Sequence, residues 1–359
     1  MIPYELNFKP RLQVLSDEQI EQIHLATLEA LERIGVQITH PQALALLDGA
    51  GARIDGNRVR IPGWLVEDAI QKAPSRVALG QRNGQRSVFL EGSKTWFGPT
   101  VDCVDYLDPL TDMRRPFTSM DGGVTAAIAD ALPNFSWVMT IGMAADVPAD
   151  ISDREIAKQV LSHCEKPLVF CSKDLNSVRD IYEMAVTIAG SEERFRQAPT
   201  VIPLTDPISP LTQYDPAVDK LLFCADKGIP VVHLSAPQAG STAPATFAGT
   251  VVQGSAESLS GLVLAQLARP GTPFVYGAFT TIMDMSTTIF SYGATETNLM
   301  VAASAQMAQY YRLPFMGTGG CSDAKFPDPQ AAAEAAMSCL SSTLSGANLI
   351  HEPGQLDHG

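Results

Sequence analysis

Short apolar runs alternate with amphipathic patterns along the chain from Lys94 onward. The runs have strand length, and the segments between them place apolar residues three and four apart, which is typical of helices. Eight such strands are predicted: Thr95–Pro99, Ser136–Gly142, Pro167–Ser172, Thr200–Thr205, Pro230–Ala236, Pro273–Phe279, Leu313–Gly319 and Leu349–Glu352. The helices predicted between them include Arg154–Glu165, Val178–Gly190, Ala217–Lys227, Ala245–Ala268, Thr295–Tyr311 and Gln330–Leu344. Eight strands joined by right-handed helical crossovers predict an α/β fold, a (β/α)8 TIM barrel over residues 95–359, with a three-layer open sheet as the alternative.

Residues 1–94 follow a different pattern. Ser16 and Gln19 form a capping-box sequence, and apolar residues at helical spacing follow until Gly35. Two turn signals of β-hairpins come next, Asp55–Asn57 and Asn83–Gly84, with a helical pattern between them. We therefore predict a small N-terminal α+β cap in front of the barrel.

Two features depart from a regular barrel. Turn residues in the segment Asp102–Phe117 predict a hairpin inserted after the first barrel strand. The chain ends soon after the eighth strand, so the barrel is predicted to lack its last helix. Three alternatives account for this: the N-terminal helix covers the gap, a partner subunit covers it, or the polypeptide is shortened.

The composition excludes several classes of protein. There are 25 Lys and Arg against 39 Asp and Glu, a net charge of −14, and no basic run that would neutralise phosphates, so nucleic-acid binding is not expected. The N-terminus lacks the apolar core of a signal peptide, and the longest apolar stretch, Ile229–Leu267, is broken by Pro, Gly and Ser and contains Glu257. We expect a cytoplasmic protein without membrane segments, whose six cysteines are free thiols.

The active site of a barrel forms at the carboxyl ends of its strands. The residues predicted there are mainly aromatic, Gly and Ser, with few carboxylates, and they favour a moderately apolar substrate that carries a positive charge. No metal site is expected, because His233, His351 and Cys321 come singly from different strands. The glycine run Gly317–Gly320 is interpreted as a tight loop and not as a phosphate cradle. Gln253 and Glu257 are interpreted as a buried structural pair.

Seven stretches distributed over the barrel are similar to those of a known family: Phe97–Pro116, Glu165–Cys171, Thr205–Leu211, Ala236–Gly277, Ala294–Pro314, Gly317–Glu334 and Gly346–Gly354. On these stretches the chain resembles the trimethylamine methyltransferase family, in its non-pyrrolysine branch, which is similar to glycine betaine methyltransferase. The resemblance implies a TIM barrel that moves a methyl group from a methylated amine onto the Co(I) corrinoid of a separate protein. The part that resembles the pyrrolysine neighbourhood of the name-giving members contains only ordinary residues here, Cys321 and Ser322 among them.

The implied donor is a quaternary amine, glycine betaine or a related betaine, in one-carbon metabolism of the kind found in methanogenesis. A corrinoid protein is the implied partner, and a homo-oligomer is expected. The residues predicted to bind the substrate are Trp96, Phe97, Tyr106, Tyr276, Phe279, His233 and His351. The residues predicted at the mouth loops are Glu296, Gly319, Gly320, Cys321, Ser322, Asp323 and Lys325. A lyase or aldolase acting on a small carboxylated metabolite, or a non-catalytic betaine-binding protein, is the alternative function.

Overall fold

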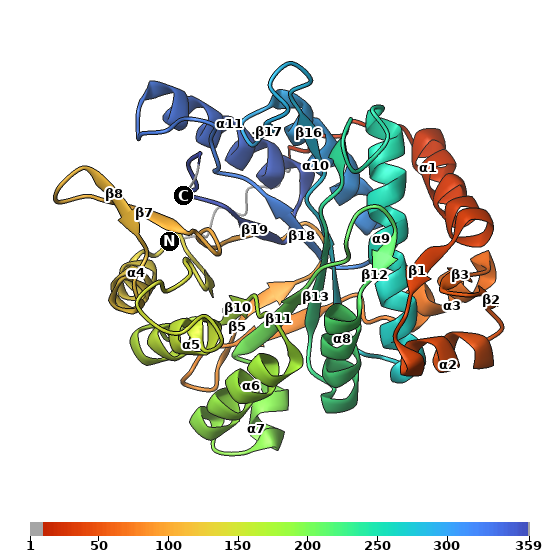
Figure 1. Ribbon diagram of the computed structural model, residues 1–359, viewed down its shortest axis with the longest axis horizontal. Coiled ribbons are helices and arrows are strands. Elements are labelled where there is room, and N and C mark those ends of the chain that lie inside the picture. Colours follow the sequence, from red (N-terminus) through yellow and green to blue (C-terminus); the bar gives the residue numbers. More distant parts are fainter. Residues whose placement is uncertain (1–9, 358–359) are drawn as a thin grey trace, which may run out of the picture.

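The computed structural model describes residues 10–357, and its centre is a closed parallel β-barrel (Figure 1). The barrel strands are β6 (Trp96–Phe97), β9 (Val138–Met139), β10 (Leu168–Phe170), β11 (Val201–Thr205), β13 (Val231–Ser235), β15 (Phe274–Ala278), β18 (Phe315–Thr318) and β19 (Leu349–His351). Each strand pairs in parallel with the next, and β19 returns to β6. A parallel bridge between Phe97 and Phe135 closes the ring between β6 and β9.

All eight predicted strands are present, so the predicted barrel is confirmed. The helices that follow them are α4 (Ser119–Ala131), α5 (Ser152–His163), α6 (Leu175–Ala189), α7 (Glu192–Gln197), α8 (Asp215–Lys227), α9 (Phe247–Ala268), α10 (Thr295–Tyr310) and α11 (Pro329–Ser345). The short α7 was not predicted. None of the helices within residues 10–357 is both long and apolar enough to cross a bilayer. The cytoplasmic location stays a prediction.

The barrel has two apolar layers, because successive strand residues point to opposite faces. In β13, Val232 faces the barrel interior, whereas Val231 packs in the outer layer with the helices. The hairpin of β4 (Val77–Gly80) and β5 (Arg86–Leu90) belongs to the inner layer and lies at the amino end of the strands, where Gly80 N donates to Pro199 O. This hairpin therefore closes the bottom of the barrel and leaves the carboxyl ends of the strands for a site.

The rest of the N-terminal part packs outside the barrel, on the right in Figure 1. It consists of α1 (Asp17–Glu29), a π-helical turn (Ala30–Ile34), β1 (Val36–Ile38), α2 (Pro41–Gly49), β2 (Arg53–Asp55), β3 (Arg58–Arg60) and α3 (Gly63–Lys72). The predicted capping box is confirmed, since Ser16 Oγ accepts from Gln19 N and Gln19 Oε1 accepts from Ser16 N. The strand β1 pairs with β12 (Thr212–Gln213), which lies in the loop after β11. The helix α2 was not predicted, and a domain boundary at residue 94 stays a prediction.

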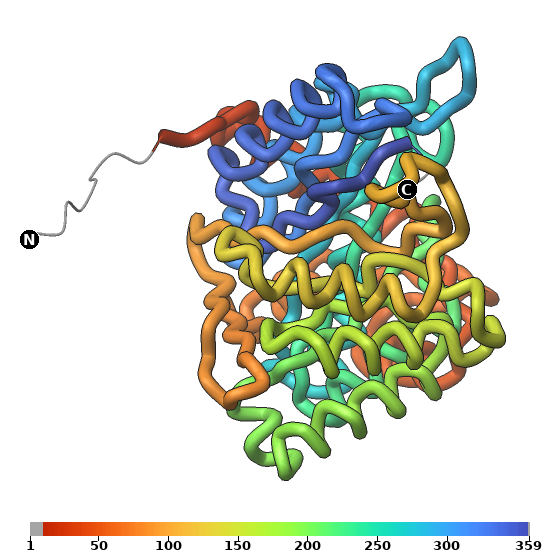
Figure 2. Tube along the Cα trace, turned by 90° about the vertical axis from the view of Figure 1, so that its left-hand side faces the viewer, coloured from red at the N-terminus to blue at the C-terminus, as the bar shows by residue number. Residues whose placement is uncertain are grey.

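The N-terminal helix does not take the position of an eighth barrel helix. It packs against α9 and α10, on a different part of the ring from β19 and β6. In Figure 2 the chain around β6, in orange, runs between α11 in blue and α4 in yellow, and no helix follows β19 as far as Asp357. These two flanking helices expose several large apolar side chains: Met120, Val124 and Ile128 on α4, and Met337 and Leu340 on α11.

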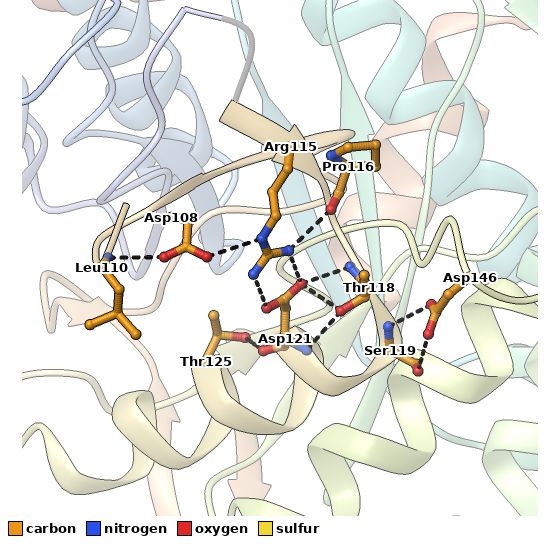
Figure 3. Close-up of polar contacts among 9 residues, drawn as sticks. All are labelled: Asp108, Leu110, Arg115, Pro116, Thr118, Ser119, Asp121, Thr125 and Asp146. Carbon is orange, nitrogen blue, oxygen red and sulfur yellow. Dashed lines mark hydrogen bonds and ion pairs between the residues drawn. The ribbon is translucent and has the colours of Figure 1, made fainter. Parts of the chain in front are cut away.

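The predicted hairpin after the first barrel strand is present, as β7 (Asp105–Asp108) and β8 (Met113–Pro116). Arg115 holds it to α4, because its guanidinium donates two hydrogen bonds to Asp121, of 2.7 and 2.8 Å, and one of 3.1 Å to Asp108 (Figure 3). The guanidinium also lies 4.8 Å from the centre of the Tyr106 ring. These bonds lower the pKa of the Asp121 carboxyl to about 2. The hairpin is thus fixed beside the barrel mouth by one arginine.

We expect Arg115→Ala to release this hairpin while the barrel stays folded. The free energy of unfolding should fall slightly, because charge-assisted hydrogen bonds to two carboxylates are lost from a solvent-exposed guanidinium. Hydrogen exchange should become faster at the amides of residues 105–116. Arg115→Lys is the matched variant, since it keeps the charge but not the two-pronged contact, and it should give a smaller change. Unchanged exchange in Arg115→Ala would contradict this role.

Candidate active site

Four rings meet at the carboxyl end of the barrel and form what we call the aromatic cluster: Phe279, Phe290, Tyr292 and His351. Phe279 follows β15 on an inward-facing position, and His351 ends β19 on another. The centre of the Phe279 ring lies 5.6, 6.0 and 5.9 Å from the centres of Phe290, Tyr292 and His351. Aromatic faces at these separations provide a surface that attracts an organic cation.

Phe290 and Tyr292 come from the loop between β15 and α10. This loop contributes β16 (Thr281–Met283) and β17 (Phe290–Ser291) to a small sheet, whose third strand, β14 (Gln238–Ala239), comes from the loop after β13. Asp323 anchors its last part, because its two carboxylate oxygens accept from Tyr292 N at 2.7 Å and Gly293 N at 3.0 Å. Burial raises the pKa of Asp323 even though both bonds lower it. Asp323, which was predicted to lie at the mouth, therefore fixes the part of the loop that carries Tyr292 of the aromatic cluster.

A buried carboxylate, Glu352, lies at the edge of the aromatic cluster. Its Oε1 is 2.6 Å from Nδ1 of His351, and both side chains are almost completely buried. Glu352 has a φ of 92°, an unusual conformation for a residue with a side chain. Burial, followed by the charge of Glu352, raises the pKa of Tyr292 and Cys321. The mouth therefore combines ring faces with negative charge.

A second part of the mouth is a cavity of about 470 Å³, which we call the acidic pocket. Its lining includes Asp102, Asp153, Lys173, Asp206 and Tyr214. Burial raises the pKa of Asp102 to about 6, and it also raises the pKa of Asp206. The expectation that few carboxylates line the mouth is therefore wrong. Asp206 directly follows β11, whereas Asp102 lies in the loop after β6 and Asp153 in the first turn of α5, so the loops decide which acids turn into the cavity.

Comparisons with known proteins identify the fold and the family. A family model described as trimethylamine methyltransferase matches residues 1–359. The chain belongs to the trimethylamine methyltransferase family. It is 35% identical over 346 residues to the trimethylamine methyltransferase of Desulfitobacterium hafniense (strain DSM 10664 / DCB-2), covering 96% of this chain and 70% of that protein.

Two further comparisons agree with this. The glycine betaine methyltransferase of Desulfitobacterium hafniense (strain Y51) is 29% identical, covering 97% of this chain and 73% of that protein. The crystal structure of the Methanosarcina barkeri monomethylamine methyltransferase matches with a TM-score of 0.63 at 11% identity, covering 96% of this chain and 71% of that one, which supports the barrel fold. The chain is thus a methyltransferase with a (β/α)8 barrel.

Two predicted substrate residues of this methyltransferase lie away from the mouth. His233 and Tyr276 are cross-strand partners on β13 and β15, so they share a face, and it is the face that packs against the helices. The Tyr276 hydroxyl lies 2.8 Å from Ser255 Oγ on α9. Both rings are completely buried between the sheet and the helices. They are structural, and neither contacts the aromatic cluster.

The ring nitrogens of His233 are both engaged. Nδ1 lies 2.7 Å from Thr205 Oγ1, and Nε2 lies 3.1 Å from Gln213 Nε2. Burial lowers the pKa of His233 from 6.5 to about 3, so the imidazole is neutral at physiological pH. A neutral histidine with two partners cannot bind a substrate carboxylate without rearrangement.

The lowered pKa of His233 predicts that the folded protein loses stability at acidic pH. The unfolded chain binds a proton at His233 near pH 6.5 and the folded chain only near pH 3, so stability falls as the pH drops below 6.5. The loss approaches about 1.4 kcal/mol per pH unit between these two values. His233→Gln should remove this part of the slope when urea midpoints are compared between pH 7 and pH 5. An identical slope in the variant would show that another group is responsible.

The three other predicted aromatic residues also lie outside the aromatic cluster. Trp96 sits toward the bottom of the barrel, where its Nε1 donates to Phe89 O on β5 at 3.0 Å. Phe97 faces the outer layer. Tyr106 is on the hairpin, stacked under Arg115 and edge-on to Phe117 at 6.0 Å. Only Phe279 and His351 of the predicted substrate residues are brought together by the fold.

The loop Gly317–Gly320 packs closely against neighbouring backbone at the barrel mouth. Gly320 has a φ of 99°, and its N–H donates to Ser338 Oγ at 2.8 Å, while Gly319 N–H donates to His351 O at 3.0 Å. These N–H groups are occupied within the protein, as expected of a tight loop and not of a phosphate site. Ser322 Oγ donates to Glu334 at 2.6 Å, which steadies the same loop.

The remaining mouth residues have different surroundings. Cys321 is buried, and burial raises the pKa of its thiol, which disfavours a thiolate nucleophile. Lys325 is exposed and lies 3.8 Å from Asp357. Glu296 is exposed in the first turn of α10, where a negative charge favours the helix. Within residues 10–357, no three His, Cys, Asp or Glu side chains converge in a way that could hold a metal ion.

Proposed function

We propose that this methyltransferase takes a methyl group from a small quaternary amine and transfers it to the Co(I) corrinoid of a separate protein. The aromatic cluster carries this proposal, because it gathers Phe279, Phe290, Tyr292 and His351 at the carboxyl end of the barrel, with the three other rings packed against Phe279. Two relatives are named for trimethylamine and for glycine betaine, which are both small methylated amines. Glycine betaine and related betaines are the donors that the sequence led us to expect.

The chemistry needs little acid or base from this chain. A quaternary nitrogen already carries the positive charge, so the C–N bond breaks with its electron pair moving to nitrogen and a neutral amine leaves. The reduced corrinoid supplies the electron pair that forms the new bond to the methyl carbon. No proton is transferred, and the task of the chain is to orient the N–CH3 bond toward the barrel opening.

The residues of the aromatic cluster perform this positioning. Each ring face attracts the methylammonium group by about 0.5–2 kcal/mol. Glu352 contributes negative charge near the cation, while His351 fills the position at the end of β19. Because the charge on nitrogen disappears during transfer, very tight binding of the cation would stabilise the substrate more than the transition state. Ring faces give a suitably moderate attraction.

Methyl transfer to free cob(I)alamin tests this proposal. The purified chain is incubated anaerobically with a quaternary amine, and the loss of the cob(I)alamin absorbance is followed together with the release of the demethylated amine. We expect turnover that depends on both the chain and the amine. A folded protein that transfers no methyl group from any quaternary amine would exclude the proposal. Binding without turnover would indicate a binding protein, and a borohydride-trapped lysine adduct would indicate a lyase or aldolase.

We also propose that two copies of the chain associate through α4 and α11. Met120 and Ile128 on α4 are 76% and 52% exposed, and Leu340 on α11 is 60% exposed, so apolar side chains face outward on both sides of β6. Large exposed apolar patches mark interaction surfaces. Sedimentation should show a dimer that Ile128→Asp dissociates. A wild-type chain that is monomeric at micromolar concentration would contradict this proposal.

A further inference from the structure

The charges at the barrel mouth distinguish between possible methyl donors. Asp102 and Asp206 line the acidic pocket, and Glu352 lies beside the aromatic cluster. The two parts are neighbours, because Asp102 lines the acidic pocket and the adjacent Cys103 contacts Gln355, whose N–H donates to Glu352 O at 2.9 Å and whose Oε1 accepts from Cys103 Sγ at 3.3 Å. The charges of Glu352 and Asp102 both add to burial in raising the pKa of the Cys103 thiol, to about 11. The mouth therefore carries carboxyl groups both in the acidic pocket and beside the rings.

His351 adds an observation that points to a ligand group. Its side chain is almost completely buried, and Nε2 has no hydrogen-bond partner among the described residues. Nδ1 lies 2.6 Å from Glu352 Oε1, although the alignment is not that of a hydrogen bond. Nε2 is thus a buried ring nitrogen that can exchange a hydrogen bond with a ligand.

The cations near the mouth offset these carboxylates only in part, since the charge of Lys220 lowers the pKa of Asp206 while burial, the larger effect, raises it. Lys220 is buried on α8, where its Nζ donates to Ser172 O at 2.9 Å, behind the end of β10. Lys173 lines the acidic pocket, but its side chain is exposed, with Nζ 3.5 Å from Ala149 O. Arg115 is bound to Asp108 and Asp121. A carboxylate on the ligand would thus meet mainly like charge.

We propose that the methyl donor carries a hydroxyl or amino group on its non-methyl arm and no carboxylate. Choline represents this class. The methylammonium group would lie on the aromatic cluster, and the arm would offer its hydrogen-bond donor to the carboxyl groups of the acidic pocket, with His351 Nε2 as a further polar contact. The pocket volume of about 470 Å³ leaves room for such an arm. This inference rests on the function proposed above and names the class of its substrate.

Three amines test the inference, because they differ mainly in the arm. Choline carries a hydroxyl, glycine betaine carries a carboxylate at a similar position, and tetramethylammonium has no arm. Methyl transfer to cob(I)alamin and calorimetric binding are measured for each amine. We expect kcat/KM for choline to exceed that for glycine betaine by at least about tenfold, since a like charge a few ångströms away is costly in a partly desolvated site.

Two isosteric variants test the role of charge, one inside the acidic pocket and one outside it as the control. Asp206→Asn removes a carboxylate from the acidic pocket and should reduce the preference for choline over glycine betaine several-fold. Asp150→Asn changes an exposed aspartate that does not line the pocket, and it should leave the preference unchanged. A preference that is the same in Asp206→Asn and in the wild type would overturn the inference.

The inference and the proposed function fail in different ways. If tetramethylammonium and glycine betaine are demethylated as fast as choline or faster, methyl transfer stands and the inference is wrong. If choline binds at least about tenfold more tightly than glycine betaine but no amine is demethylated, the charge preference stands and the proposed function is wrong.

Discussion

Glu257→Ala is expected to lower the free energy of unfolding by about 3–5 kcal/mol, because it removes a buried carboxylate on which four donors depend. Glu257 accepts from Ser209 Oγ at 2.7 Å, Leu211 N at 2.9 Å, Ser235 Oγ at 2.6 Å and Gln253 Nε2 at 2.9 Å. These partners lie on the loop after β11, on β13 and on α9. Without the carboxylate, a buried N–H such as that of Leu211 has no acceptor, which costs about 1–3 kcal/mol for each unsatisfied group.

Urea unfolding measures this effect through the transition midpoint at an unchanged m-value. Glu296→Ala is the matched control, because Glu296 is exposed in the first turn of α10, and its loss should change stability by less than about 1 kcal/mol. A loss below 1 kcal/mol in Glu257→Ala would mean that water satisfies the stranded donors. Gln253 and Glu257 are in contact, as the sequence predicted for a structural pair.

Phe279→Ala is expected to lower kcat/KM for methyl transfer by about tenfold to a hundredfold. Phe279 is the ring that touches all other members of the aromatic cluster, with centre distances of 5.6, 6.0 and 5.9 Å. Its removal takes away one cation–π contact and leaves Phe290 and Tyr292 without the ring against which they pack. The cation would then be held loosely, and misorientation of the reacting bond adds to the loss.

Tyr276→Phe is the control for this experiment. Tyr276 lies on β15, three residues before Phe279, and it faces the helices, so loss of its contact with Ser255 should cost stability but not methyl transfer. The readout is the rate of cob(I)alamin consumption at several amine concentrations, with circular dichroism to confirm folding. A Phe279→Ala enzyme with the wild-type rate, or a Tyr276→Phe enzyme with a similar loss, would show that the aromatic cluster is not the binding site.

Much of the fold was predictable from local pattern. Each barrel strand is an apolar run with turn residues at its ends, and helices such as α5 and α6 bury one apolar face, so hydrophobic burial identifies both. The hairpin at Asp102–Phe117 and the capping box at Ser16 follow from turn and cap chemistry in the same way. The short helix α7 was missed because six residues are too few to show a helical period.

Much less of the candidate site was predictable, although one signal was available. Within a strand, residues that alternate with the inward-facing ones must face the helices. Applied to β13 and β15, this rule assigns His233 and Tyr276 to the outer face and Phe279 to the interior. Phe290 and Tyr292 had no such signal, since they lie in a loop whose position depends on hydrogen bonds from their chain to Asp323.

The order of the barrel strands and of most helices, the family and the reaction class were determined by the sequence alone, because local burial patterns and shared stretches carry that information. The tertiary structure decided which residues meet. Closure of the sheet turned His351 inward and His233 outward, and loop packing brought Tyr292 and the Glu352 carboxylate to the barrel mouth. The physical reason is that contacts between distant segments depend on the register and closure of the whole barrel, which no short window of sequence contains.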